Sequence, residues 1–173
     1  RLHHPRLMSP SPPKARTAQT SESRPHVVVY LVDTLRARNL GCYGYGRPTS
    51  PEMDRLAEQS WLFENAQAHS SFTKCSLASL FTGRLPRSHG CLDFSQRLDE
   101  PEQTLAETLQ GAGYQCFAVV ANGLLKPGAG FDQGFSGYSC HDWEPTARLL
   151  ERSLEMIDRR DPQRPFLLYV HSM

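Results

Sequence analysis

The sequence lacks three features that would each assign it to a class of protein. It has no apolar run near the ~18 residues of a membrane-spanning helix. Its 19 Lys and Arg almost balance its 18 Asp and Glu, and the formal net charge of +1 gives no field that favours nucleic acid or an anionic membrane as a partner. It has no CxxC pair, the spacing typical of structural zinc sites. With 39% hydrophobic and 21% charged residues, the composition is that of an ordinary globular domain with a real core.

The cysteines are odd in number and far apart, which gives little support to a disulfide framework. We expect mostly reduced thiols packed as small hydrophobes. One alternative is a metal site, although its spacing fits no usual zinc pattern. Its ligands would be His69, Cys75, His89 and Cys91.

Residues 1–24 are rich in Pro, Ser, Arg and His and show no apolar periodicity. This composition predicts a disordered arm or linker. The alternative is a basic arm that follows a removed leader or a membrane anchor. The chain itself begins with Arg1 and carries no recognisable signal peptide.

Residues 25–173 alternate between buried-strand and helix patterns. Continuous β-branched and apolar runs at 27–32, 115–120 and 166–171 are typical of strands covered on both faces. We predict an α/β three-layer sandwich in which these runs are neighbouring parallel strands of a mostly parallel central sheet. The chain stops just after the third run, so we expect the sheet to continue beyond Met173.

Helix signals lie between these strands. Thr49 and Ser50 are cap candidates before Pro51, which suits a first helical residue. A second helix carries Leu105 and Leu109 and is expected to stop at the glycines 111 and 113. A third helix is expected to open at Pro145.

Two side chains stand where a parallel sheet places its ligands. Asp33 follows the first strand, and a carboxylate there suits a hard metal ion. The alternative is that it caps the next turn through the amides of Thr34 and Leu35. Thr73 opens a helix that we expect to run to Gly83, where free N–H groups and the helix dipole favour an anionic phosphate or sulfate. The alternative is that Thr73 is only the N-cap residue of that helix.

From Pro25 onward the chain resembles the N-terminal part of the sulfatase family, within the alkaline phosphatase superfamily. "HVVVYLVDTLRARNLGCYGYGRPTSPEMDRLAEQS" resembles the family's first strand, its metal-binding Asp and the segment that follows. "SSFTKCSLASLFTGRLPRSHG" resembles the segment that carries the nucleophile and runs into "SLLTGxxPxxHG". "LAETLQGAGYQCFAVVAN", "GFDQGF" and "PFLLYVHSM" match later elements in order. The resemblance covers about 150 residues and implies an alkaline phosphatase-like fold.

The register of this resemblance selects the nucleophile. The family's C-x-P-S-R motif begins ten residues before the Gly of "SLLTG", and ten residues before Gly83 is Thr73. Cys75 then stands at the position of the motif's Pro, and Leu77 at that of its Arg. The resemblance therefore implies that Thr73 is the nucleophile and a metal ligand, and that Cys75 is not converted to formylglycine.

Other positions depart from the formylglycine pattern. The family's second Asp is replaced by Thr34, and the Lys and His of "GKWHLG" are replaced by Ala121, Asn122 and Gly123. The nucleophile segment is more similar to the Thr-bearing branch, "T-x-P-S-x-A-S", of phosphoglycerol and phosphoethanolamine transferases. Even that branch has Pro where this chain has Cys75.

The resemblance implies a metal-dependent hydrolase of sulfate or phosphate esters that acts through a covalent intermediate on Thr73, with Asp33 and Thr73 as metal ligands. The implied metal is Ca²⁺ for a sulfatase, and Mn²⁺ or Zn²⁺ for a phosphotransferase. The implied partner is a sulfated or phosphorylated small molecule, glycan or lipid head group, and the implied location is extracytoplasmic. A transferase that uses the same intermediate and a non-catalytic anion-binding relative remain alternatives.

The chain is expected to carry half a site. The family's "DHG" metal ligands and the His of its "DPH" turn would lie beyond Met173. His171 lies near that turn but matches no motif residue, and His89 is expected to be structural. Because Asp33 and Thr73 supply only part of a metal's coordination shell, we expect these 173 residues to be inactive by themselves.

Overall fold

The computed structural model describes residues 24–173. The predicted arm at residues 1–24 therefore lies, except for Arg24, outside the described residues. Among the helices of the described part, none combines the length and the apolar character needed to cross a bilayer.

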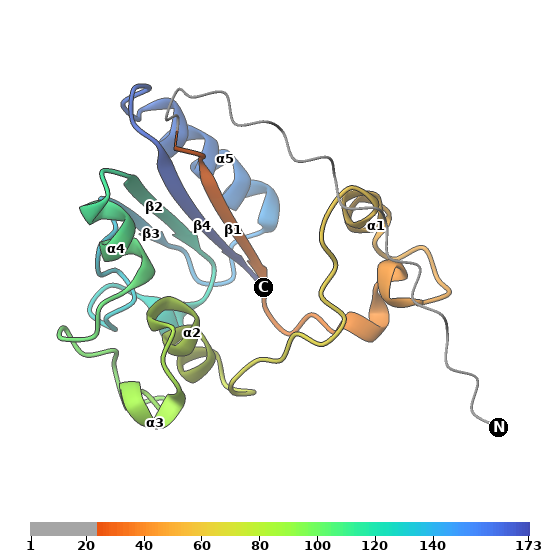
Figure 1. The fold of residues 1–173 in the computed structure, drawn as a ribbon, viewed down its shortest axis with the longest axis horizontal. Coiled ribbons are helices and arrows are strands. Elements are labelled where there is room, and N and C mark those ends of the chain that lie inside the picture. The colour runs from red at the N-terminus through yellow and green to blue at the C-terminus, as the bar shows by residue number, and fades with distance from the viewer. Residues whose placement is uncertain (1–23) are drawn as a thin grey trace.

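The centre of the fold is a parallel sheet with the strand order β1-β4-β2-β3 (Figure 1). Its strands are β1 (Val27–Val32), β2 (Gln115–Val120), β3 (Gly137–Cys140) and β4 (Phe166–Ser172). β4 pairs with β1 from Val27↔Leu167 to Val32↔Ser172, and on its other side with β2. The three predicted strands are confirmed as parallel neighbours, and β4 is one residue longer than predicted.

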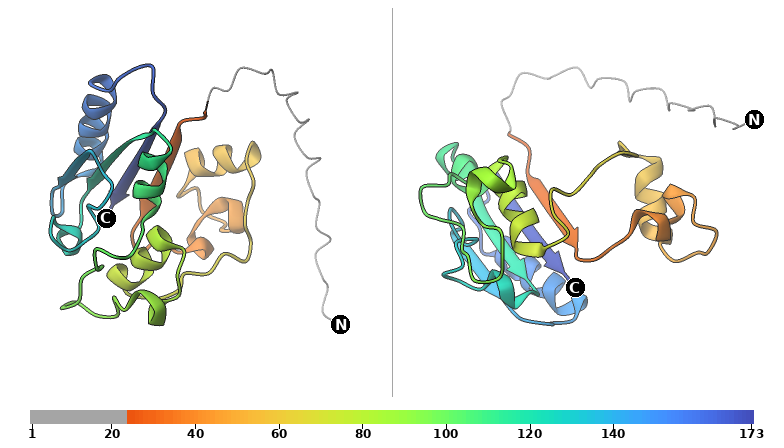
Figure 2. Two further views of the ribbon diagram at one scale, coloured as in Figure 1. Left: turned by 60° about the vertical axis from the view of Figure 1, so that its left-hand side comes forward. Right: turned by 90° about the horizontal axis from the view of Figure 1, so that it is seen from below.

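Helices cover both faces of this sheet. The helices are α1 (Pro51–Glu58), α2 (Thr73–Thr82), α3 (Pro86–His89), α4 (Leu105–Gly111) and α5 (Thr146–Asp158), with short 3₁₀ turns at Ala37–Asn39, Gly41–Tyr43 and Gly123–Leu125. α5 packs against one face, and α2 and α4 pack against the other (Figures 1 and 2). α1 and the first two 3₁₀ turns lie apart, beyond the β1 edge (Figure 2).

The period of two along each strand divides the core between the two faces. On β2, Ala118 and Val120 face α2, where they join Leu77 and Phe81 in one buried cluster. The intervening Val119 faces α5. On β4 the same alternation sends Leu168 and Val170 toward α5, and it sends Leu167, Tyr169 and His171 the other way.

Two details differ from expectation. The sequence does not predict β3, because its segment, GYSC, is four residues long and has no β-branched residue. α1 begins at Pro51 as expected, but the hydroxyl of Ser50 does not cap it. That hydroxyl accepts from the Gly41 N–H and donates to Asp54, both at 3.0 Å, so it ties the helix to the preceding 3₁₀ turn.

Gly134 allows a loop to approach the start of α4. Its φ is +81°, and a Cβ there would overlap the backbone nitrogen of Glu107. Thr104 caps the same helix end, since its hydroxyl accepts from the Glu107 N–H while the Glu107 carboxylate accepts from the Thr104 N–H. Loop, cap and helix therefore form one closely packed corner.

Gly134→Ala is expected to destabilise a folded protein that contains this chain by about 3–5 kcal/mol, because left-handed strain adds to a backbone overlap. Gly44→Ala is the matched control: its φ is +90°, but a Cβ there would meet no other atom within 4 Å. The control should cost only about 1–2 kcal/mol. Urea unfolding measures both, and equal losses would contradict the close approach.

Candidate active site at the carboxyl edge of the sheet

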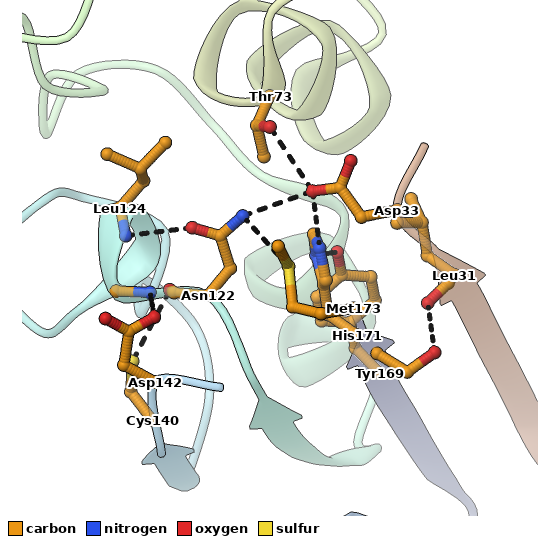
Figure 3. Close-up of polar contacts among 12 residues, drawn as sticks. Leu31, Asp33, Thr73, Asn122, Leu124, Cys140, Asp142, Tyr169, His171 and Met173 are labelled. Atoms are coloured by element: carbon orange, nitrogen blue, oxygen red, sulfur yellow. Dashed lines mark hydrogen bonds and ion pairs between the residues drawn. The ribbon is translucent and has the colours of Figure 1, made fainter. Parts of the chain in front are cut away.

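Polar side chains from four segments converge where the parallel strands end (Figure 3). Asp33 follows β1, Asn122 follows β2, and His171 is the penultimate residue of β4. Thr73 is the first residue of α2, which packs over the same end. The expectation that Asp33 and Thr73 share one edge is met, and the sheet adds Asn122 and His171 to them.

One oxygen of Asp33 receives three hydrogen bonds. Oδ2 accepts from the Thr73 hydroxyl at 3.3 Å, from the Asn122 amide at 3.1 Å and from the His171 ring at 3.1 Å (Figure 3). None of these bonds comes from the amides of Thr34 or Leu35, so the turn-capping alternative is wrong. Asp33 is 15% exposed, and these donors compensate for much of its lost hydration.

The backbone turns sharply directly after Asp33. Thr34 has φ = +57°, which is an unusual conformation for a β-branched residue. The Asp33 N–H meanwhile continues the ladder by donating to the carbonyl of Ser172 at 2.9 Å. Asp33 therefore makes the last ladder hydrogen bond between β1 and β4, and the chain leaves the sheet directly after this residue.

Thr73 is not the N-cap of α2. The N-cap position belongs to Phe72, which makes no side-chain capping bond. The Thr73 hydroxyl points to Asp33 instead, from the first helical position, where backbone N–H groups lack intrahelical partners. α2 runs to Thr82 and ends at Gly83, as expected.

The amide of Asn122 has a defined orientation. The Leu124 N–H donates to its Oδ1 at 3.0 Å, so Nδ2 faces Asp33 and donates to it. Nδ2 of Asn122 is therefore a neutral hydrogen-bond donor that is fixed on the carboxylate.

His171 is completely buried and uses both ring nitrogens. Nε2 contacts Asp33, and Nδ1 lies 2.9 Å from the hydroxyl of Tyr169. Burial lowers the pKa of His171, and the nearby Asp33 only partly opposes this effect. Burial likewise raises the pKa of Tyr169 well above its usual value.

The two residues that depart from the motif of the nucleophile segment, Cys75 and Leu77, are apolar. Cys75 and Leu77 are 4% and 3% exposed, as packing residues should be, and Leu77 belongs to the main core cluster. All five cysteines are free thiols; Cys75, Cys91 and Cys116 are buried as predicted, whereas Cys42 and Cys140 are partly exposed. Burial raises the pKa of the Cys91 thiol, which disfavours the thiolate form that binds metals.

His89 has a structural environment. Its Nε2 lies 3.0 Å from the Ser79 hydroxyl, and its Nδ1 accepts from the Cys91 N–H at 3.2 Å. Both nitrogens are thus engaged in joining α2 to the segment after α3, and neither is directed to a shared metal with His69.

The described residues include no group of three or more His, Cys, Asp and Glu side chains arranged to hold a metal ion. They do place two oxygens of the kind that hard cations prefer, on Asp33 and Thr73, within 3.3 Å of each other. This donor set fits part of the shell of a divalent cation.

Lys74 is buried and anchors the loop at residues 92–97. Its ammonium group donates to the carbonyl oxygens of Phe94, at 3.0 Å, and Gln96. The Phe94 ring packs on Phe72 with ring centroids 4.3 Å apart. The residues on either side of Thr73 therefore hold this loop against the N-terminal end of α2.

Lys74→Met should keep the packing of the stem but leave two carbonyls without their donor, at a cost of about 1–3 kcal/mol. We expect faster hydrogen exchange at the amides of Ser95 and Gln96. Arg97→Met is the control, because the ion pairs that Arg97 makes with described residues are all exposed, and the change should cost less than about 1 kcal/mol. Unchanged exchange in Lys74→Met would show that the lysine does not anchor the loop.

Sequence reasoning assigned Asp33 and Thr73 but gave no site role to Asn122, His171, Tyr169 or Lys74. A signal for two of them existed, since Asn122 and His171 lie at the ends of predicted neighbouring strands. Parallel strands bring such positions to one edge. Nothing comparable marks Lys74, because a lysine beside a predicted helix start is normally exposed.

Comparisons with known proteins identify the family and the fold of the chain. A family model described as Sulfatase matches residues 25–173. The chain is 25% identical over 176 residues to N-acetylglucosamine-6-O-sulfatase of Bacteroides thetaiotaomicron. This alignment covers 91% of this chain and 32% of that protein. The chain is 26% identical over 201 residues to N-acetylgalactosamine-6-sulfatase of Homo sapiens. This alignment covers 84% of this chain and 38% of that protein.

A solved structure supports the fold. The chain superposes with a TM-score of 0.77, at 23% identity, on a protein determined in complex with its substrate D-glucosamine-2-N,6-O-disulfate. The match covers 86% of this chain and 34% of that one. The chain therefore spans about a third of the length of the relatives it matches.

Proposed function

The chain belongs to the sulfatase family, and we propose that it supplies the nucleophile half of the active site of a hydrolase that cleaves sulfate esters. Its alkaline phosphatase-like α/β fold, with four parallel strands, is the framework for that site. The observation that carries the proposal is the 3.3 Å contact between the Thr73 hydroxyl and Asp33 at the motif register of the nucleophile.

Each residue of the site has a role in this proposal. The Thr73 hydroxyl gives up its proton as its oxygen attacks the sulfur of the ester. The bond from sulfur to the leaving oxygen breaks, and that oxygen takes up a proton to leave as the alcohol. Water then hydrolyses the sulfated Thr73 to sulfate and the free hydroxyl. Asp33 receives the hydrogen bond of the hydroxyl and orients it. The unpaired N–H groups at the start of α2 face the anionic group of the substrate.

A divalent cation would be held by Asp33 and Thr73, together with ligands from outside the described residues. When bound, it would lower the pKa of the hydroxyl and neutralise oxyanion charge. The donors are all oxygens, so we propose Ca²⁺ for sulfate ester hydrolysis. Since residues 1–173 supply only part of its shell, they should show no turnover alone.

The names of the relatives suggest a substrate class. Both are sulfatases of a 6-sulfated N-acetylhexosamine, and we propose sulfated sugars of this kind as the first substrates to test. Thr73, in place of Cys, favours a second candidate, the Thr-bearing branch, in which the intermediate is a phosphoryl group passed to an alcohol.

We predict that full-length protein with Ca²⁺ releases sulfate from N-acetylglucosamine-6-sulfate or an aryl sulfate faster than it cleaves aryl phosphate or bis-aryl phosphate esters. Ion chromatography measures the sulfate. Preferential cleavage of phosphate esters with Mn²⁺ or Zn²⁺ would favour the transferase branch instead. No turnover and no covalent adduct with any ester would leave a non-catalytic anion-binding relative, and the proposal would be wrong.

Thr73→Ala is expected to abolish covalent capture of substrate, because it removes the attacking hydroxyl. Thr73→Ser, which keeps a hydroxyl, is the matched control. Cys75→Ser should keep most activity, since Cys75 is a packing residue. Intact-mass spectrometry follows the adduct, and circular dichroism checks folding. A loss of about 18 Da at Cys75, the mark of formylglycine, would overturn the assignment, as would an inactive Cys75→Ser beside an active Thr73→Ala.

A further inference from the structure

A line of hydrogen bonds leads from the core to the nucleophile. The Tyr169 hydroxyl contacts Nδ1 of His171, Nε2 of His171 contacts Oδ2 of Asp33, and Oδ2 accepts from Thr73 (Figure 3). We call the first three residues the Tyr169–His171–Asp33 chain. Tyr169 and His171 are 2% and 0% exposed, and both lie on the face of β4 that packs against α2.

The direction of each bond follows from its neighbours. The Leu124 N–H fixes the Asn122 amide, whose Nδ2 can only donate, so Oδ2 of Asp33 is an acceptor. His171 must then carry its proton on Nε2 and donate it to Asp33. A neutral ring has a bare Nδ1, which accepts the hydroxyl proton of Tyr169.

The two oxygens of Asp33 are thereby made unequal. Oδ2 takes the donors of His171, Asn122 and Thr73, whereas Oδ1 takes no hydrogen bond from the described residues. A carboxylate held at one oxygen cannot rotate freely, and the other oxygen stays available to a cation.

Burial of this histidine has no packing reason. Apart from the Tyr169 hydroxyl, the residues clustered on the same face of the sheet are apolar, and an apolar side chain at residue 171 would avoid the loss of hydration. Tyr169 keeps one polar atom in the core for the His171 contact alone, while its ring packs edge-on against Phe81 at 4.9 Å.

We propose that His171 is a positioning residue that, locked by Tyr169 as the Nε2–H tautomer, holds Asp33 so that Oδ2 faces the Thr73 hydroxyl and Oδ1 faces the cation. This inference rests on the proposed function, because it concerns the same metal and nucleophile. A histidine that only filled the core would affect stability but neither Asp33 nor metal affinity.

The test compares His171→Gln with His171→Asn in the full-length protein. The Gln amide nitrogen can take the place of Nε2 and donate to Asp33, whereas Asn is too short to reach it. Calorimetric titration with Ca²⁺ should give about 10- to 100-fold weaker affinity for His171→Asn and near wild-type affinity for His171→Gln. Tyr169→Phe should weaken binding less, since it removes the tautomer lock but keeps the ring.

His89→Gln is the control, because His89 is also buried and doubly hydrogen-bonded but does not contact Asp33. It should lower thermal stability and leave Ca²⁺ affinity unchanged. Wild-type affinity in a folded His171→Asn would overturn the proposal. If that variant fails to fold, wild-type affinity in Tyr169→Phe, which retains the ring packing, would overturn it equally.

Crystal structures of the same variants separate this proposal from the proposed function. If the wild-type protein binds no Ca²⁺, the metal-dependent function fails, and the orientation of Asp33 still decides the role of His171. We expect the carboxylate to turn away from Thr73 in His171→Asn and to keep its place in His171→Gln. An unmoved Asp33 in His171→Asn would contradict the proposal.

Discussion

The site depends on a single carboxylate oxygen. Three segments that are distant in the sequence donate to Oδ2 of Asp33: the start of α2, the segment that follows β2 and the end of β4. Because the Asp33 side chain is largely buried, its carboxylate requires hydrogen-bond donors. Each of the three segments therefore lies where it can supply one. The sheet brings the donors to one edge, and the carboxylate holds them there.

The ten residues of helix α2 contribute both to the polar edge of the sheet and to the core. Its first residue faces the polar edge, whereas Leu77, Ala78 and Phe81 lie in the core under the sheet. Cys75 and Leu77, which depart from the sulfatase motif, are on the buried side. Both departures therefore contribute to the packing of the helix against the core and not to the polar edge. The buried Lys74 extends this attachment to the neighbouring loop.

The features predictable from sequence were those with a local signal. Val27–Val32 and Gln115–Val120 are continuous apolar runs, and their strands have the predicted bounds. β3 has no such pattern and forms because β2 offers it a free edge. Asp33 and Thr73 were predicted from their places after a strand and at a helix start, and from the motif resemblance. Lys74 was not, because its burial depends on carbonyls about 20 residues away in the chain, which no local pattern reveals.

The pairing of β1 with β4 has a consequence for synthesis. Within the described residues β4 is the only partner of β1, and the His171–Asp33 contact spans 138 positions. At roughly 5–20 residues per second, a ribosome takes about 7–28 s to make that interval. During this time the first strand emerges with its backbone groups unpaired, and such an extended apolar segment is open to non-native strand pairing until β4 has been made.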